Sequence, residues 1–206
     1  MYYADRYDAA RQLLPLLEPF KNEDGLVLAI PRGGVPVGVV VAQYLQWPLD
    51  LLMTKKIGHP DNPEFAIGAV SLDDSLVEET AGVPESYIQE MTIRIREQLA
   101  ERYRLFRGNA KPLPRRNKTL LVVDDGIATG RTILSTLRLL RSQSPARLIV
   151  AAPVASGQAA ERIRRVTDVF CCPLVREDFR AVGNYYDDFP QVEDEEVIRL
   201  LQESAD

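Results

Sequence analysis

The sequence has few of the cysteine and histidine residues that form disulfides or bind zinc. Its 206 residues include two cysteines and one histidine. Cys171 and Cys172 are adjacent, within a stretch expected to be a strand, and adjacent cysteines seldom pair with each other. Without a histidine cluster they do not form a zinc site either. His59 precedes a proline in a predicted loop, where we expect a surface position. The composition therefore gives no indication of redox or zinc chemistry.

Long apolar runs and a basic surplus are also absent. No run reaches the roughly 18 apolar residues of a membrane span, and residues 1–6 lack the apolar region of a signal peptide. The formal net charge of -5 does not provide the basic field that nucleic acids or acidic membranes attract. We expect a cytoplasmic protein without nucleic-acid or membrane partners. With 46% hydrophobic residues and no repeats, residues 1–206 are predicted to form a single domain.

The most informative stretch is a short apolar run that ends at two acids. Residues 120–123 are all apolar, which is typical of a buried parallel strand, and Asp124 and Asp125 follow. Gly126 and Gly130 permit a tight turn that can present backbone N–H groups, and residues 133–140 have the apolar pattern of a helix. A turn at a helix N-terminus is suited to an anion, and a phosphate is the expected one.

Three other interpretations fit this stretch less well. A Walker A loop needs four residues between its glycines and then Lys-Ser/Thr, whereas three residues separate Gly126 from Gly130 and Arg131 follows. A response-regulator receiver needs more strands and helices downstream than the chain contains. A plain strand-turn-helix with capping acids does not require two glycines and two threonines together.

Residues 122–132, Val-Val-Asp-Asp-Gly-Ile-Ala-Thr-Gly-Arg-Thr, resemble the phosphoribosyl-pyrophosphate (PRPP) motif of type I phosphoribosyltransferases. In that family the paired acids hold the ribose hydroxyls, and the loop amides and threonine hydroxyls hold the 5-phosphate. The resemblance implies that Asp124 and Asp125 take part in catalysis. It also implies that PRPP is bound by the residues of the turn, namely Gly126, Ile127, Ala128, Thr129, Gly130, Arg131 and Thr132.

A second glycine-rich turn, Pro31-Arg32-Gly33-Gly34, lies between a predicted strand and a predicted helix over 35–45. Arg32 has a planar donor fork suited to phosphate oxygens, and Gly33 and Gly34 let backbone amides approach an anion closely. The turn resembles the family's pyrophosphate loop, which grips the diphosphate leaving group. By the same resemblance we expect a non-proline cis peptide at Pro31-Arg32.

The predicted fold is α/β, with a doubly wound, mostly parallel five-stranded sheet. The expected strands are 26–30, 49–53, 119–124, 147–153 and 168–172, with ligands at their carboxyl ends. An amphipathic helix over 4–17 is expected to serve packing. We expect a flap insertion at about 54–117, comprising a mobile loop over 55–63, a hairpin over 65–77 and a helix over 87–106. A C-terminal hood should span about 173–206.

The resemblance also suggests roles for flap and hood residues. A lysine or arginine of the flap commonly meets the leaving pyrophosphate, and Lys55 or Lys56 is the candidate, with Lys56 preferred. Tyr185 and Tyr186 are predicted to line the acceptor site, or alternatively to cover a dimer interface. Asp187 corresponds to an aspartate that helps hold Mg²⁺ in hypoxanthine-guanine enzymes. Those enzymes have an aromatic residue where Arg180 stands, so a purine acceptor is not indicated.

The predicted function is a Mg²⁺-dependent phosphoribosyltransferase that moves a 5-phosphoribosyl group from PRPP to a nucleobase-like or other small acceptor, releasing pyrophosphate. The alternative is a non-catalytic, regulatory sensor of PRPP or a nucleotide on the same fold. Residues 30–36 and 63–70 resemble a group of predicted phosphoribosyltransferases of unsettled substrate. A homodimer is common in the family and is the oligomer that the resemblance suggests, although the sequence does not determine the oligomeric state.

Overall fold

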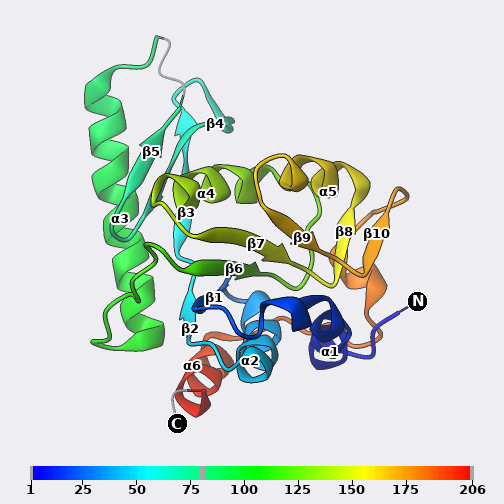
Figure 1. The fold of residues 1–206 in the computed structure, drawn as a ribbon. Helices are drawn as coiled ribbons and strands as arrows, with labels where there is room; N and C mark the ends of the chain where they lie inside the picture. Colours follow the sequence, from blue (N-terminus) through cyan, green and yellow to red (C-terminus); the bar gives the residue numbers. More distant parts are fainter. Residues whose placement is uncertain (1, 79–81, 205–206) are drawn as a thin grey trace.

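A five-stranded parallel sheet forms the centre of the molecule (Figure 1). The structure is a computed structural model and describes residues 2–78 and 82–204, apart from the side chains at 131 and 132. The strand order is β2-β1-β6-β7-β9. The strands are β1 (Gly25–Ala29), β2 (Leu49–Leu51), β6 (Thr119–Val123), β7 (Arg147–Ala151) and β9 (Val169–Cys171). All five predicted strands and their parallel direction are confirmed.

Helices cover both faces of this sheet, as the doubly wound prediction requires. Figure 1 shows α1 (Arg6–Leu17) and α2 (Gly34–Leu45) on one face, and α4 (Arg131–Ser142) and α5 (Gly157–Arg164) on the other. Successive strand residues point to opposite faces. Val27 and Ala29 of β1 therefore join the core beneath α1 and α2, whereas Leu26 and Leu28 join the core beneath α4 and α5.

The segment predicted as a flap forms a second sheet and a long helix to one side of the first (Figure 1). β3 (Thr54–His59), β4 (Asn62–Ser71) and β5 (Ser75–Val77) are antiparallel, and α3 (Glu85–Arg107) follows. The predicted mobile loop over 55–63 is wrong, because most of it belongs to β3 and β4. Pro63 is tolerated because it lies within a register shift, where the pairing passes from Gly58 opposite Ala66 to His59 opposite Asn62, and because β5 pairs only with Gly68–Val70. The two register shifts, on either side of Gly58, are typical of β-bulges and allow β3 and β4 to pair despite the irregular sequence.

The C-terminal segment crosses the carboxyl edge of the sheet and meets the start of the chain. It contains β10 (Leu174–Arg176), which pairs with β8 (Val154–Ser156), then the 3-10 helix η2 (Val182–Tyr185) and α6 (Asp194–Glu203). A further 3-10 turn, η1 (Glu18–Phe20), follows α1. The Tyr3 N–H donates to the Tyr185 carbonyl at 2.8 Å, and the Asp187 N–H donates to the Tyr3 carbonyl at 2.8 Å. The predicted hood is therefore fastened to the N-terminal segment by backbone hydrogen bonds.

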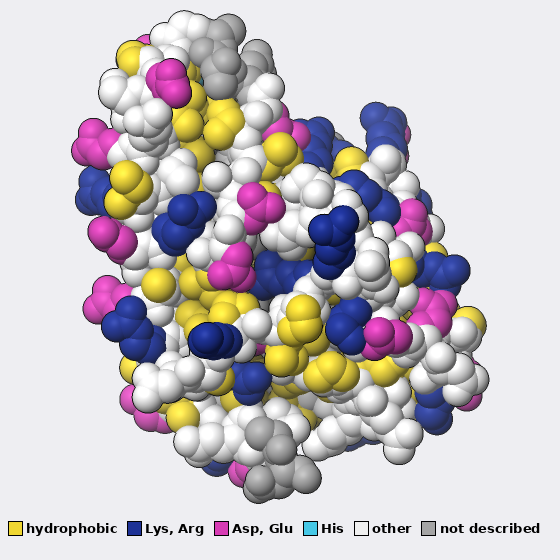
Figure 2. Space-filling model, turned by 60° about the vertical axis from the view of Figure 1, so that its left-hand side comes forward, with side chains coloured by type: hydrophobic (Ala, Val, Ile, Leu, Met, Phe, Trp, Pro, Cys, Tyr) yellow, Lys and Arg dark blue, Asp and Glu magenta, His cyan; other side chains and the backbone are white. Residues whose placement is uncertain are grey.

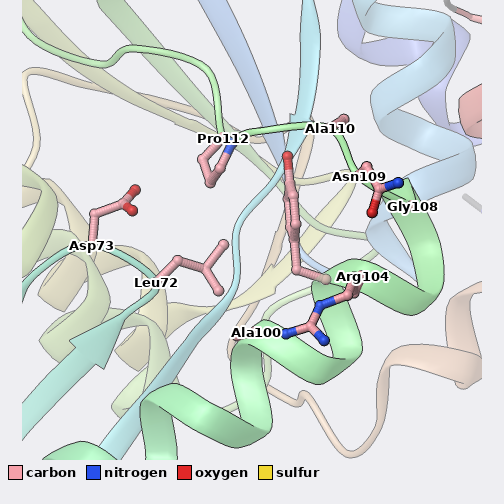
Figure 3. Close-up of a pocket in the computed structure, with 9 residues that line it drawn as sticks. Leu72, Asp73, Ala100, Arg104, Gly108, Asn109, Ala110 and Pro112 are labelled. Carbon is pink, nitrogen blue, oxygen red and sulfur yellow. The ribbon is translucent and has the colours of Figure 1, made fainter.

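A buried carboxylate joins α3 to the central sheet. Asp50 of β2 is fully buried and accepts hydrogen bonds from the Tyr103 hydroxyl at 3.0 Å and from the Leu113 N–H at 2.8 Å. Burial and the charge of Asp50 raise the pKa of Tyr103 to about 12, so the phenol stays protonated and donates. Beside Tyr103 lies a cavity of about 330 Å³, lined by α3, Leu72, Asp73 and residues 108–112 (Figure 3).

The surface carries charges of both signs. On the face shown in Figure 2, acidic side chains lie among the basic ones. Among the helices that the structure describes, none is both long enough and apolar enough to cross a membrane.

Replacing Asp50 with alanine should lower the free energy of unfolding by roughly 3–5 kcal/mol, because buried donors and the nearby Arg107 lose their acceptor. Chemical denaturation measures this. Asp24→Ala is the matched control, since this carboxylate is 77% exposed and its ion pair with Lys118 should contribute less than about 1 kcal/mol. Similar losses in the two variants would contradict the structural role of Asp50.

Candidate functional site

The two glycine-rich turns lie side by side at the carboxyl edge of the sheet. β1 and β6 are neighbours in parallel register, with Ala29 opposite Val123. The Ile30 N–H extends the pairing by donating to the Val123 carbonyl at 2.9 Å. Residues 31–34 and 124–130 consequently leave the sheet at the same place. The peptide bond between Pro31 and Arg32 is cis, as predicted.

Glycine is required where the two turns touch. A Cβ added to Gly33 would lie 2.1 Å from Oδ2 of Asp125, and one added to Gly34 would lie 2.7 Å from the Val123 carbonyl oxygen. Neither gap accommodates a methyl group, so the backbone of the first turn lies directly against the acidic end of β6. The two motifs found separately in the sequence therefore form one site.

The two acids of this site are held in different surroundings. Asp124 accepts a hydrogen bond from the Asp125 N–H at 2.9 Å. Burial raises the pKa of Asp124 well above its ordinary value, and the neighbouring charge of Asp125 adds to the effect. Burial also raises the pKa of Asp125, which is 13% exposed, but here a bond from Arg6 opposes the rise. The pair thus holds protons more tightly than isolated carboxylates do.

The second turn ends at the N-terminus of α4. Gly130 has a φ of +67°, a conformation that favours glycine, and its carbonyl accepts the first helical bond, from the Leu134 N–H at 3.1 Å. Ile127 is buried and holds the turn to β8, since its N–H donates to the Val154 carbonyl at 2.9 Å. Ala128 and Thr129 are exposed between these anchors. This arrangement leaves the positive end of a twelve-residue helix beside the acids. The side chains of Arg131 and Thr132 are outside the described part.

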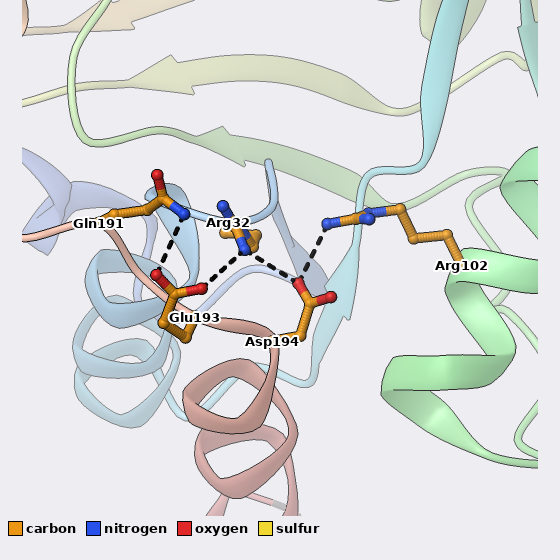
Figure 4. A network of polar contacts seen from close by, with 5 residues as sticks. All are labelled: Arg32, Arg102, Gln191, Glu193 and Asp194. Carbon is orange, nitrogen blue, oxygen red and sulfur yellow. Dashed lines mark hydrogen bonds and ion pairs between the residues drawn. The ribbon is translucent and has the colours of Figure 1, made fainter.

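Arg32 extends toward the start of α6. Its Nη1 lies 3.3 Å from Oε2 of Glu193 and 3.3 Å from Oδ1 of Asp194 (Figure 4). Arg102 of α3 shares Asp194, with its Nη2 3.1 Å from the same Oδ1. Glu193, the N-cap of α6, and Asp194, its first residue, therefore both hold the arginine of the first turn. Asp194 also holds the arginine of α3.

A cavity of about 290 Å³ opens beside this cluster. It is bounded by Pro31 of the first turn, Asp124 of the second, Thr54 at the start of β3 and Arg102 of α3, and its remaining walls are mostly apolar. Lys56, the predicted flap cation, does not line it. The Lys56 ammonium lies 3.1 Å from Oε2 of Glu64, within the β3–β4 hairpin. In this conformation Arg102, which belongs to the predicted flap, shares a cavity with Asp124.

The hood residues differ from the prediction. Tyr185 and Tyr186 were expected to face an acceptor or a dimer partner, but their exposed fractions are 9% and 7%. They pack in a buried cluster with Tyr3 and Val154. Burial of these aromatic rings beneath the N-terminal segment stabilises the packing. The Tyr186 hydroxyl donates to the Asp125 carbonyl at 2.5 Å. Tyr186 therefore supports the acidic turn from within, whereas Tyr185 stacks on Phe179. Asp187, the predicted metal ligand, is exposed next to them.

Sequence analysis missed Arg6, which the prediction placed on a helix that only packs. Arg6 is the first residue of α1, and its Nε donates to Oδ2 of Asp125 at 2.8 Å. The helix dipole disfavours a cation at a helix N-terminus. The position of Arg6 in the predicted helix could therefore have indicated a tertiary partner. Arg102, Glu193 and Asp194 were missed as well, and nothing in their local sequence distinguishes them from solvated charges.

Comparison with known proteins agrees with this geometry. The family model of the phosphoribosyl transferase domain matches residues 8–190. Two proteins of Mycobacterium tuberculosis strains, provisionally named phosphoribosyl transferases, are 35% identical over 208 residues, covering 97% of this chain. The chain spans 46% of the length of these curated relatives. It belongs to the phosphoribosyl transferase domain family.

Solved structures share the fold. The protein TT1426 from Thermus thermophilus is 39% identical, with a TM-score of 0.87 over 98% of this chain and 99% of that chain. A hypothetical protein of Neisseria gonorrhoeae, crystallised with ppGpp, is 14% identical with a TM-score of 0.50 over 98% of both chains. At that identity the likeness concerns the fold alone.

The surroundings of Asp124 predict how stability depends on pH. Folding raises the pKa of the Asp124 carboxyl. Ionising this carboxyl in the folded protein is therefore costly, so its contribution to the free energy of unfolding falls as the pH rises. Asp124→Asn should therefore raise the free energy of unfolding by roughly 0.5–2 kcal/mol at pH 8, and the gain should shrink toward pH 4. Denaturant titrations at several pH values measure this, with Asp24→Asn as the control for a lost charge. A gain independent of pH would contradict the assignment.

Proposed function

We propose that the chain binds PRPP across the two turns and transfers its phosphoribosyl group to a small acceptor, releasing pyrophosphate. The observation that carries this proposal is the direct contact between Gly33 and Asp125, which joins an anion-binding turn to a pair of carboxylates beside a helix N-terminus. A ligand that fits this arrangement has a phosphate at each end and hydroxyl groups between them. PRPP has this form, and the family membership supports the choice.

Each part of the proposed ligand has a matching part of the site. The 5-phosphate would lie at the N-terminus of α4 against the turn from Gly126 to Thr132, where backbone N–H groups and the helix dipole favour an anion. Asp124 and Asp125 would accept hydrogen bonds from the ribose hydroxyls. Arg32 and the amides of Gly33 and Gly34 would stabilise the diphosphate as it leaves, and this charge stabilisation is the main catalytic contribution expected of the protein.

We propose Mg²⁺ as the metal that accompanies PRPP. In the described part of the chain, no group of three or more His, Cys, Asp or Glu residues could hold a metal ion. This fits Mg²⁺, which commonly keeps several waters and takes phosphate oxygens plus one or two carboxylates. The exposed Asp187 would provide one carboxylate, and the ion would neutralise charge on the diphosphate. A cytoplasmic location is proposed from the sequence pattern, and a homodimer from the family resemblance.

The acceptor is proposed as a nucleobase-like or other small molecule, without further assignment. A cavity of about 260 Å³ lies between Thr129 of the anion turn and Phe179 and Arg180 of the hood, so the hood borders the turn as expected. Lys56 would reach the diphosphate only after leaving Glu64. Arg102 already lies beside Asp124 and is the additional candidate for that role.

The decisive experiment incubates the protein with PRPP, Mg²⁺ and a panel of nucleobases and related small acceptors while pyrophosphate release is followed. Turnover with one acceptor supports the transferase and identifies the substrate. Tight PRPP binding without turnover across the panel would favour a sensor, and absence of PRPP binding would overturn the proposal.

Asp124→Asn and Asp125→Asn should each weaken PRPP binding by roughly 10- to 100-fold, the effect of losing one charged hydrogen-bond partner. Isothermal titration calorimetry measures the affinity, and circular dichroism checks that the fold is retained. Asp24→Asn, at an exposed position distant in the sequence, controls for net charge. Unchanged affinity in both variants would remove the acids from the site.

Releasing Arg32 from α6 should strengthen diphosphate binding. In Glu193→Gln/Asp194→Asn, Arg32 loses both of its ion pairs and Arg102 loses its pair with Asp194, so we expect a roughly two- to fivefold tighter affinity for PRPP, in line with the small energies of partly exposed pairs. Glu195→Gln/Glu203→Gln removes the same charge from the same helix and serves as the control. Equal affinities in the two double variants would show that the α6 acids do not compete with the ligand.

A further inference from the structure

Arg6 is a buried cation whose contacts are all tertiary. It is 7% exposed although it begins α1. Its Nε donates to Oδ2 of Asp125 at 2.8 Å, and its Nη1 donates to the Pro190 carbonyl at 2.7 Å. The guanidinium carbon lies 3.8 Å from the centre of the Phe189 ring. One side chain therefore connects the N-terminal helix, the acidic turn and the hood.

The segment that carries Arg6 is itself held in place. The Asp5 carboxylate caps α1 by accepting from the Asp8 N–H at 2.7 Å. Tyr3 exchanges backbone hydrogen bonds with Tyr185 and Asp187, and the Asp188 N–H donates to the Ala4 carbonyl at 2.9 Å. Because both sides of residue 6 are anchored, the arginine is presented to Asp125 in a fixed orientation.

Asp125 is enclosed by these contacts. Arg6 lies on one side of its carboxylate and the backbone of Gly33 on another, at a distance that excludes any side chain there. Among the described side chains, the charged and titratable groups that interact with it are Arg6 from α1, Asp124 from its own turn and Tyr186 from the hood. Burial raises the pKa of Tyr186, so its hydroxyl remains a donor to the Asp125 carbonyl. Arg6 is thus the cation whose bond opposes protonation of Asp125.

We propose that Arg6 is a positioning residue of the phosphoribosyl site, which fixes the orientation of the Asp125 carboxylate and keeps it ionised as an acceptor for a ribose hydroxyl. This inference rests on the proposed function. Asp124, which has no bond from Arg6, is then the acid of the pair that more readily takes up a proton. The N-terminal helix contributes to ligand binding through one side chain that does not itself touch the ligand.

The test compares Arg6→Ala and Arg6→Lys with two controls. Arg11→Ala removes an exposed arginine from the same helix, and Tyr3→Phe loosens the N-terminal segment by removing the Tyr3 hydroxyl bond to the Pro153 carbonyl. Three quantities are measured for each protein: the melting temperature, the titration midpoint of the Asp125 carboxyl by ¹³C NMR, and PRPP affinity from pH 6 to 9.

In Arg6→Ala the Asp125 midpoint should move to higher pH, and PRPP affinity should fall roughly tenfold or more at pH 7, the scale of a lost bond to a charged group, with recovery toward pH 9. Arg6→Lys should retain part of the wild-type affinity because it keeps the charge without the planar fork. Tyr3→Phe should lower the melting temperature without moving the midpoint, and Arg11→Ala should change none of the three quantities.

Unchanged midpoint and affinity in Arg6→Ala, with only a lower melting temperature, would overturn the inference and leave Arg6 a purely structural residue. If Arg6→Ala does not fold, the Arg6→Lys variant provides the test. A PRPP affinity and pH profile of Arg6→Lys identical to those of the wild type would also overturn the inference. Failure of the wild-type protein to bind PRPP would instead overturn the proposed function, and the NMR midpoints would still report whether Arg6 controls the ionisation of Asp125.

Discussion

The close approach of the Gly33–Gly34 backbone to the acidic end of β6 is the constraint on which the site depends. It arises from the register of β1 and β6, which brings both turns to one edge of the sheet. Any side chain at residue 33 would collide with the Asp125 carboxylate. The site is therefore formed by two main-chain segments in contact, and the surrounding elements hold these segments in place.

This arrangement places two negative charges close together in a largely buried site. Positive groups from more than one element of the fold offset these charges. Two adjacent carboxylates are largely buried, and burial favours their protonated forms. The positive end of α4 and the guanidinium of Arg6 oppose this tendency. Arg32, by contrast, is paired with α6 acids in the described conformation. The site therefore combines two acids whose pKa values are raised, one cation bound to Asp125 and one cation paired with α6, as is common where stability is balanced against ligand binding.

The hood has a larger structural role than its loop-like sequence indicates. Its tyrosines pack beneath the N-terminal segment, and Tyr186 donates to the main chain of the acidic turn. Movement of the hood would therefore be transmitted to Asp125 through Tyr186 and through the Arg6 bond to Pro190. The hood and the acidic turn are therefore coupled through two hydrogen bonds and do not form independent parts of the fold.

The sequence by itself determined the five parallel strands and the two turns, because these features follow from local patterns: short apolar runs, paired glycines and a motif at fixed spacing. The cis bond at Pro31-Arg32 was expected only from the family resemblance of the first turn. Other local patterns led to predictions that differ from the structure. Gly58 and Pro63 indicated a loop where bulges and an unpaired strand side allow a hairpin, and two tyrosines resembled a binding wall but form a buried cluster. Only the tertiary structure brought Arg6 to Asp125 and Arg102 to Asp194. Ion pairs between residues more than ninety positions apart leave no periodic trace in a sequence, since their energy depends on burial and orientation that the folded chain alone provides.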